Sequence, residues 1–184
     1  MGDVFGRYIS GISGDYLFHS VPYYSISEED LELEEFNKLG EQASQGCVRL
    51  AVSDAKWVYD NCPTGTNVSI YDDAENAGPL GKPDAIKITD FTNKWDPTDS
   101  NKKCPYAKAT PIISGANDYT IKSGGEFYAL AGVTAVDTCG NDITSNIEVF
   151  GNVITTRKGK YKVTYSVTDV LKRTSSVTIT VTVA

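Results

Sequence analysis

The clearest alternation of hydrophobic and polar residues runs through the last third of the chain. In residues 159–169, tyrosine and valine occupy every second position, with lysine, threonine and serine between them. Residues 175–184 alternate valine and isoleucine with serine and threonine. A period of two is typical of antiparallel strands with one buried face. With the shorter β-rich runs at 125–137 and 145–155, this pattern predicts a sandwich of two packed sheets.

Two segments in the first part of the chain have helical signals. The first begins at Ser27, a good N-cap, continues with acidic residues that suit the positive end of a helix, and ends at Gly40. The second spans residues 53–63, with serine and aspartate at its start and proline at its end. Its positions predicted to face a core are Ala55, Val58 and Tyr59.

Extended patterns surround these helices. Residues 7–13 and 15–21 are predicted to be two strands joined by a Ser-Gly turn, and residues 64–72 a returning strand after the second helix. Glycine and proline interrupt residues 76–108, which predicts a linker or packed arm with at most one short strand, at residues 84–89.

These elements predict an α+β, mostly β chain with a change of character near residue 109. Residues 1–75 form a mixed region with a sheet and short helices, residues 76–108 the linker or arm, and residues 109–184 the β-sandwich. A length of 184 residues suffices for two small domains that each bury a core.

Charge and hydropathy exclude some functions. The net charge of −7 argues against general nucleic-acid binding, because phosphate neutralisation needs a surplus of lysine and arginine. No apolar run approaches the roughly 20 residues that span a bilayer, so no membrane span is expected.

The cysteines are even in number but sparse. Cys47, Cys62, Cys104 and Cys139 lack a C-x-x-C spacing, and His19 is the single histidine, so no metal site is expected. A disulfide between Cys62 and Cys104 is a hypothesis that would pin the arm to the first region. Cys139 lies in a predicted turn, where we expect an exposed free thiol.

Cys47 stands in the run "SQGCVRL". A nucleophilic cysteine reacts as thiolate and needs a base or positive charge, because a free thiol has a pKa of ~8.5. His19 is the available base, Arg49 adds positive charge, and Gly46 permits close backbone approach for an oxyanion hole. A buried thiol or one half of a disulfide is the alternative interpretation of Cys47.

The order of "FHS", "SQGCVR", an Asp-Ala helix and a G-T-x-V strand, over about residues 7–72, resembles the YkuD-like L,D-transpeptidases. The resemblance implies a cysteine acyltransferase: Cys47 attacks a peptidoglycan stem tetrapeptide, releases D-alanine and passes the acyl group to a neighbouring stem amine. His19 would be the base, and the backbone carbonyl of Ser20 would orient it. The implied substrate and oxyanion residues are Ser44, Gln45, Gly46 and Arg49.

The same resemblance implies that carbapenems acylate Cys47, that no cofactor is needed, and that the protein is secreted or attached to a Gram-positive-type cell wall. Papain-like peptidases place cysteine before histidine, and sortases use a different cysteine context, so both fit poorly. Residues 110–184 resemble the bacterial immunoglobulin-like (Ig-like) domains of surface proteins, through runs such as "TPIISGANDYTIKSGGEF" and "GKYKVTYSVTD".

Two departures keep a second interpretation open. Gln45 stands where the family usually has a second histidine, and the strands that usually precede the first histidine are missing. A catalytically impaired wall-binding or surface-display module is therefore the alternative. The acidic run at residues 27–35 is either a lid that attracts the acceptor amine or a solvated helix face. Trp57 and Trp95 either line a groove or pack in a core.

Overall fold

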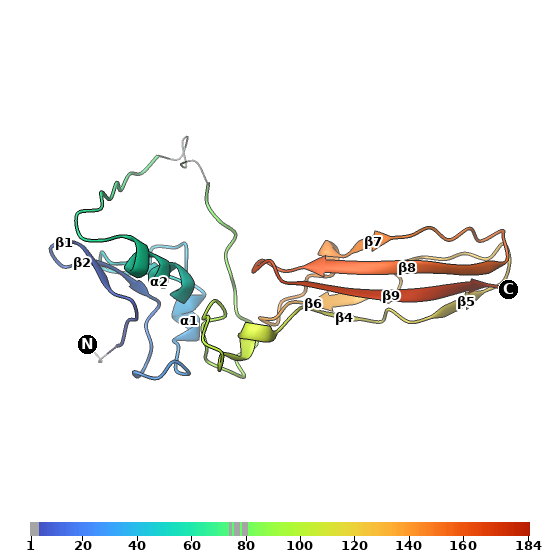
Figure 1. Ribbon diagram of the computed structural model, residues 1–184, viewed down its shortest axis with the longest axis horizontal. Helices are drawn as coiled ribbons and strands as arrows, with labels where there is room; N and C mark the ends of the chain where they lie inside the picture. Colours follow the sequence, from blue (N-terminus) through green and yellow to red (C-terminus); the bar gives the residue numbers. More distant parts are fainter. Residues whose placement is uncertain (1–3, 74, 76–77, 79–80) are drawn as a thin grey trace. The chain divides into compact units, whose positions relative to one another are not determined.

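The computed structural model describes residues 4–73, 75, 78 and 81–184 (Figure 1). The chain divides into a first unit, Met1–Lys108, and a second unit, Ala109–Ala184. Strands and irregular segments predominate and the helices are short, which confirms the predicted α+β, mostly β class. The predicted start of the linker, at residue 76, lies outside the described residues.

The second unit is organised around a long antiparallel pair. β8 (Gly159–Thr168) and β9 (Thr174–Val183) pair in register along their whole length. The predicted alternation is confirmed, because Val163, Tyr165 and Val181 are each at most 1% exposed while their neighbours in sequence are more accessible. This buried face forms the core of the unit.

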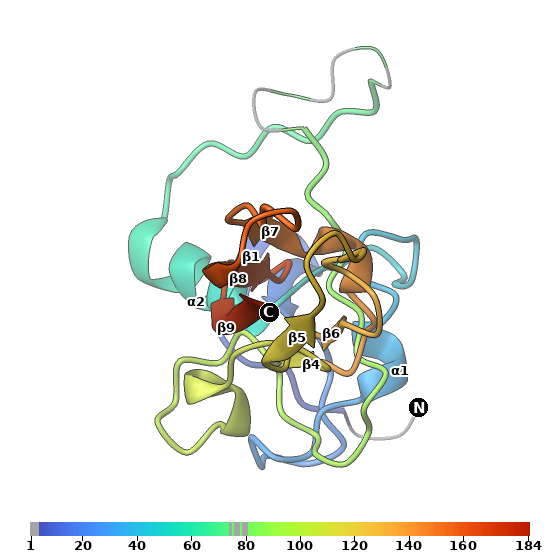
Figure 2. The same ribbon diagram turned by 90° about the vertical axis from the view of Figure 1, so that its right-hand side faces the viewer.

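Shorter strands complete the sandwich. β5 (Tyr119–Ile121) and β7 (Glu148–Phe150) flank the long pair in the order β5-β9-β8-β7. β4 (Ile112–Ser114) and β6 (Thr134–Val136) lie side by side as a separate two-stranded sheet (Figure 2). The two predicted runs around β6 and β7 are mostly irregular, since only three residues of each form a strand.

In the first unit, β1 (Ser10–Ser13), β2 (Tyr16–Ser20) and β3 (Val48–Leu50) form a sheet in that order. β1 and β2 are antiparallel, as predicted from the turn between them, and Gly14 occupies that turn with φ +55°. β2 and β3 are parallel. This parallel pair carries the sequence-predicted site.

The second predicted helix is confirmed as α2 (Val52–Asn61), but its cap is not local. The backbone N–H of Val52 donates to the carboxylate of Asp96, 44 residues away, at 2.8 Å. Asp96 is fully buried, and burial raises its pKa to about 6. Ala55 faces the core as predicted, whereas Tyr59 is 59% exposed and the prediction for it is wrong.

The first predicted helix, residues 27–40, is wrong in extent. Only α1 (Leu33–Phe36) is helical. The backbone N–H groups of Leu31 and Glu32 donate to Lys94 and Pro22, so they are taken by distant segments before a helix can begin. Gly40 ends the turns that follow, with φ +84°.

Two predicted strands are absent from the described chain. Residues 64–72 begin with a turn and form no strand, and Val68 and Ile70 are 46% and 73% exposed. Residues 84–89 are irregular, because Asn37 uses its side-chain amide to bind the backbone of Ile88 in place of a strand partner. A period-two pattern without a neighbouring strand does not form a sheet.

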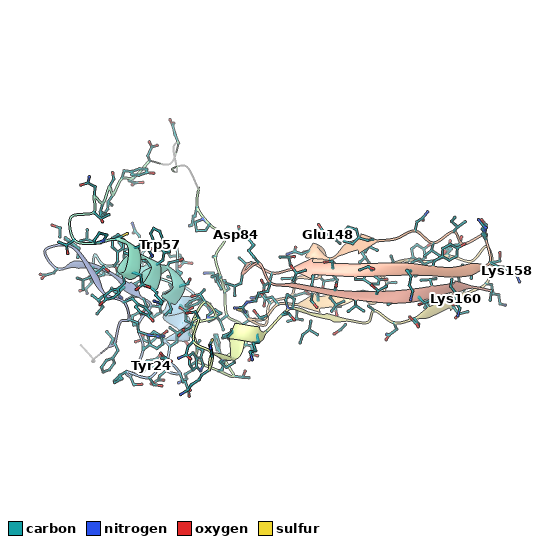
Figure 3. All side chains as sticks on the ribbon, in the orientation of Figure 1. Tyr24, Trp57, Asp84, Glu148, Lys158 and Lys160 are labelled. Atoms are coloured by element: carbon teal, nitrogen blue, oxygen red, sulfur yellow. The ribbon has the colours of Figure 1, made fainter. Side chains whose placement is uncertain are left out.

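The predicted cysteine states also need correction. All four cysteines lie in the described chain, and none forms a disulfide, so the Cys62–Cys104 pairing is wrong. Cys104 is buried with its sulfur directed to the Asp96 carbonyl at 3.7 Å, and Cys139 is 1% exposed where we expected an exposed thiol. The tryptophans differ: Trp95 is buried, whereas Trp57 projects from α2 and is 62% exposed (Figure 3).

Candidate active site

The parallel pair β2–β3 brings the two ends of the predicted motif together. Its register places Phe18 opposite Val48 and His19 opposite Arg49. Paired residues on neighbouring strands project to the same face of a sheet, so the imidazole and the guanidinium share one face. Cys47 is the residue immediately before β3, at the same edge of the sheet.

The imidazole of His19 is held in one orientation. Its Nδ1 lies 2.6 Å from the backbone carbonyl oxygen of Ser20. A carbonyl only accepts, so Nδ1 is the donor, and in a neutral ring Nε2 would then be the acceptor. Gly6 lies against the ring, and a Cβ built there would come within 3.3 Å of Nδ1. This close backbone approach was not predicted from the sequence.

Ser20 is itself fixed by Arg7. The backbone N–H of Arg7 donates to the Ser20 hydroxyl at 2.9 Å, and the N–H of Ser20 donates to the Arg7 carbonyl at 3.0 Å. The Arg7 guanidinium pairs with Glu28 and Asp99 at 2.9 and 2.6 Å. Ser20 is fully buried. Sequence reasoning missed Arg7, because its partners lie far away along the chain.

The loop before β3 is shaped by Ser44. Its hydroxyl donates to the carbonyl of Cys47 at 2.5 Å and accepts from the N–H of Gly46 at 3.1 Å. Gly46 has φ +139°, and a Cβ there would lie 2.2 Å from the Tyr16 ring. Only glycine fits this position without displacement.

The sulfur of Cys47 is half-buried and directed toward the Asp15 carbonyl at 3.8 Å. Because that oxygen only accepts, the thiol is the donor in this contact. Among the described residues, Cys47 and His19 do not form a hydrogen bond with each other. The sulfur and the imidazole are each bound to a different backbone carbonyl.

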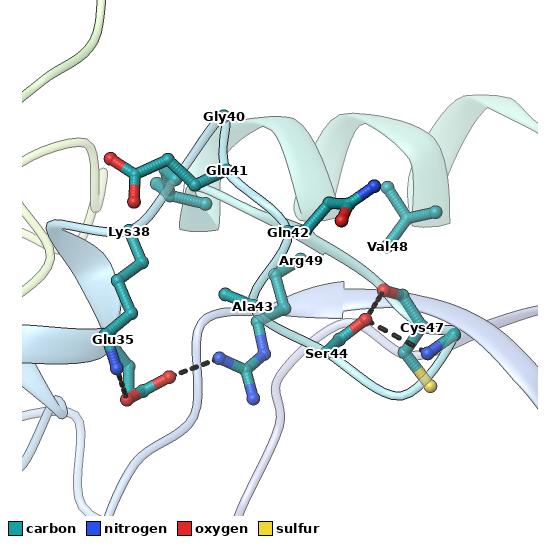
Figure 4. Close-up of a pocket in the computed structure, with 12 residues that line it drawn as sticks. Glu35, Lys38, Gly40, Glu41, Gln42, Ala43, Ser44, Cys47, Val48 and Arg49 are labelled. Atoms are coloured by element: carbon teal, nitrogen blue, oxygen red, sulfur yellow. Dashed lines mark hydrogen bonds and ion pairs between the residues drawn. The ribbon is translucent and has the colours of Figure 1, made fainter. Parts of the chain in front are cut away.

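A cavity of about 460 Å³ opens beside Cys47 (Figure 4). Three charged residues of its wall, Arg49, Glu35 and Lys38, are linked by ion pairs. One carboxylate oxygen of Glu35 accepts from Arg49 and the other from Lys38, each at 2.5 Å. The hydrogen bonds from Lys38 and then Arg49 lower the pKa of Glu35. Glu35 belongs to the acidic run, and it contacts the predicted site instead of lying on a solvated helix face.

Some of the site residues predicted from the sequence line the cavity. Ser44, Gly46, Cys47 and Arg49 line it. Gln45 is exposed and lies outside the lining residues, and His19 and Ser20 connect to the cavity only through the sheet register. Glu35 and Lys38 also line the cavity. They were not singled out from the sequence, because charged residues in a polar run usually face solvent.

The described residues offer neither a metal cluster nor a membrane-spanning helix. In the described ranges, histidine, cysteine, aspartate and glutamate side chains do not gather in groups of three or more that could hold a metal ion. Among the described helices, none has the length and hydrophobicity to cross a bilayer.

Comparison with known proteins finds two families along the chain. Residues 4–70 match the L,D-transpeptidase catalytic domain, known as YkuD, and residues 111–183 match the bacterial surface protein Ig-like domain. The chain carries a YkuD segment followed by an Ig-like domain. Both resemblances drawn from the sequence are thereby confirmed.

The YkuD segment also has a curated relative. It is 49% identical over 57 residues to YciB of Bacillus subtilis strain 168, whose own assignment as an L,D-transpeptidase is provisional. The matched stretch is 31% of this chain and 28% of YciB. The chain therefore spans less than a third of that relative.

Solved structures match about two fifths of the chain. The CBM51-2 and INT domains of Clostridium perfringens ZmpB, solved in complex with GlcNAc, are 29% identical with a TM-score of 0.37, covering 40% of this chain and 16% of that chain. A lipoprotein of Bacteroides thetaiotaomicron is 23% identical with a TM-score of 0.34, covering 40% of this chain and 37% of its own.

Proposed function

We propose that the chain acts as a peptidoglycan L,D-transpeptidase. Cys47 attacks the amide between the third and fourth residues of a stem tetrapeptide, a thioester forms, and D-alanine leaves. An amine of a neighbouring stem then attacks the thioester, the sulfur leaves, and a 3→3 cross-link results. The observation that carries this proposal is the match of residues 4–70 to the L,D-transpeptidase catalytic domain, which includes both His19 and Cys47.

The geometry around His19 supports a role as general base. With Nδ1–H bound to the Ser20 carbonyl, Nε2 is the nitrogen that can accept the thiol proton and later return one to the departing amine. Ser20 acts through its carbonyl, as a positioning residue. Catalytic hydrogen bonds are often long before substrate binds, so the Asp15 contact of the sulfur describes a resting state.

The remaining predicted residues have supporting roles in this proposal. Gly46 allows the backbone around Cys47 to approach a developing oxyanion, and Ser44 holds that loop. Arg49 supplies positive charge within the cavity, and Gln45 contacts substrate from the exposed side of the loop. The reaction uses protein groups alone and needs no cofactor.

The test is incubation of the protein with a stem tetrapeptide under reducing conditions, followed by mass analysis. We expect D-alanine release in the wild type and none from Cys47→Ala or His19→Ala. A carbapenem should add to Cys47 and give one mass shift that Cys47→Ala abolishes. Cys62→Ala is the matched control, since Cys62 is also a half-buried thiol but lies outside the cavity. Absence of both the released D-alanine and the adduct contradicts the proposal.

A second candidate, a non-catalytic wall-binding or surface-display module, is favoured by the sulfur's contact with Asp15 and by Gln45. Its test is sedimentation with purified peptidoglycan. Binding that Cys47→Ala retains, together with no D-alanine release by the wild type, selects this candidate. Under either function we propose that the protein acts at a Gram-positive-type cell surface; the match of residues 111–183 to a bacterial surface Ig-like domain supports the surface location.

A further inference from the structure

The guanidinium of Arg49, a residue that lines the cavity, is not fully hydrogen-bonded within the described chain. Its Nη1 pairs with Glu35, whereas its Nε is buried and has no hydrogen-bond partner among the described residues. A guanidinium presents its N–H groups in a fork that matches a carboxylate with two parallel bonds. One nitrogen of this fork, Nη1, is therefore paired with Glu35, and another, Nε, is unpaired in the part of the chain that the structure describes.

Glu35 pairs with two cations at once. Its carboxylate gives one oxygen to Arg49 and the other to Lys38 (Figure 4). The three side chains are 22%, 23% and 49% exposed for Arg49, Glu35 and Lys38. Ion pairs that remain this accessible contribute little net stability, because water and salt compete with them. A second carboxylate could thus replace Glu35 on Arg49 at small cost, while Glu35 stays with Lys38.

The position of Arg49 relative to Cys47 suggests which carboxylate this is. Arg49 follows Cys47 by two residues, and both line the same cavity. In a tetrapeptide donor, the free carboxylate belongs to the residue that leaves, so it lies one residue beyond the attacked carbonyl. Glu41, the other acidic residue of the cavity wall, is paired with Lys87 at 3.4 Å, outside this arrangement.

We propose that Glu35 is an internal substitute for the C-terminal carboxylate of the donor peptide, which displaces it from Arg49 when the peptide binds beside Cys47. This inference rests on the proposed function. It makes Glu35 a specificity-determining residue for peptides that end, with a free carboxylate, one residue past the attacked amide. Peptides with an amidated C-terminus, or with one further residue, gain nothing from Arg49.

The first experiment compares the free-acid tetrapeptide with its C-terminal amide. Glu35→Gln keeps the shape of the side chain and removes the competing charge, so KM for the free acid should fall roughly threefold or more while KM for the amide is unchanged. Arg49→Gln should remove the difference between the two peptides. Asp60→Asn, in the exposed Lys56–Asp60 pair of α2, is the matched control and should leave both KM values unaltered. Equal KM changes for both peptides in Glu35→Gln would overturn the inference.

The second experiment does not depend on turnover. Iodoacetate and iodoacetamide both alkylate a thiolate with loss of iodide, but only iodoacetate carries a carboxylate. Mass analysis of peptides gives the ratio of the two rates at Cys47, with Cys62 of the same molecule as internal reference, because the residues lining its pocket carry no ionised groups.

We expect this ratio at Cys47 to rise roughly threefold or more in Glu35→Gln and to fall in Arg49→Gln, with no change at Cys62. If neither peptide turns over while the ratio shifts in this way, the proposed function fails and the carboxylate site stands. If the ratio is the same in all three proteins, the carboxylate site is overturned, whatever the turnover.

Discussion

In the second unit, β8 and β9 pair over ten residues each, and the core consists of side chains that alternate along these strands. In the described part of the first unit, strands are three to five residues long. Polar contacts across long sequence separations connect them, such as Val52 to Asp96 and Asn37 to Ile88. The second unit is therefore held by repeated local pairing, and the first by individual polar contacts.

This difference bears on function, because groups that hold the first unit together also shape its cavity. The Glu35–Arg49 pair joins α1 to β3, and with Lys38 it forms part of the cavity wall beside Cys47. In the second unit, the main core cluster consists of aliphatic side chains and Tyr165. We therefore expect substitutions in the first unit to change both chemistry and stability, and those in the second to change stability alone.

The largest expected effect is on chemistry in the first unit. Replacing His19, the only histidine of the chain, by glutamine removes the proposed base and should slow D-alanine release about 10²–10⁴-fold. Single-turnover assays with the stem tetrapeptide measure this rate. Unchanged thermal unfolding of His19→Gln is the control for folding. A rate within a few fold of wild type would show that another group activates Cys47.

In the second unit, Ile179→Ala should destabilise without affecting the reaction. Ile179 is 4% exposed in the core, and its truncation leaves a cavity that costs about 2–5 kcal/mol. Both tryptophans, Trp57 and Trp95, belong to the first unit, so their fluorescence should report no change in that unit's unfolding. Far-ultraviolet circular dichroism should show the loss of the sandwich at lower denaturant. A parallel shift of the tryptophan transition would mean that the two units unfold together.

The next effect is on the pH dependence of the first unit. Burial raises the pKa of Asp96 to about 6, above the unfolded value of ~3.9. The folded state then retains a proton that the unfolded state has lost, so this carboxyl stabilises the fold most below about pH 4. Its contribution falls as the pH rises through about 6, by on the order of 3 kcal/mol.

Tryptophan-detected urea unfolding of wild type and Asp96→Asn at about pH 4 and about pH 7 measures this contribution. The asparagine keeps an oxygen that can accept from the Val52 N–H but does not ionise. We expect its stability to depend less on pH than that of the wild type. Asp84→Asn, at an exposed position, is the control. An identical pH dependence in wild type and Asp96→Asn would refute the role given to Asp96.

The same contrast explains what could be predicted from the sequence. Alternation over ten residues dictated the faces of β8 and β9, and the cysteine motif led to Cys47 and His19. The helix expected from Ser27 onward was wrong because Leu31 gives its N–H to the distant Lys94, which no local pattern reveals. Glu35 was missed for the same reason, since its partner Arg49 lies 14 residues away on another element.

The smallest expected effect is on the stability of the first unit, at Gly46. Here the cost of backbone strain can be measured separately from the cost of a side-chain clash. Gly46→Ala places a methyl group at φ +139°, and this strain should cost about 1–3 kcal/mol of first-unit stability. The same methyl group would lie 2.2 Å from the ring of Tyr16. Tyr16→Ala in the same chain removes that clash and leaves the strain, so the double variant should recover only part of the loss.

Tryptophan-detected unfolding measures both variants of Gly46, and iodoacetamide labelling reports whether Cys47 has moved. Ser44 holds the loop by accepting a hydrogen bond from the Gly46 N–H. A change in the backbone at Gly46 should therefore shift the sulfur of the adjacent Cys47. Full recovery in the double variant would mean that the ring contact alone selects glycine here. If Gly46→Ala loses no stability, the loop adjusts freely to the added methyl group. The stability of the first unit would then depend less on single contacts than the comparison with the second unit implies.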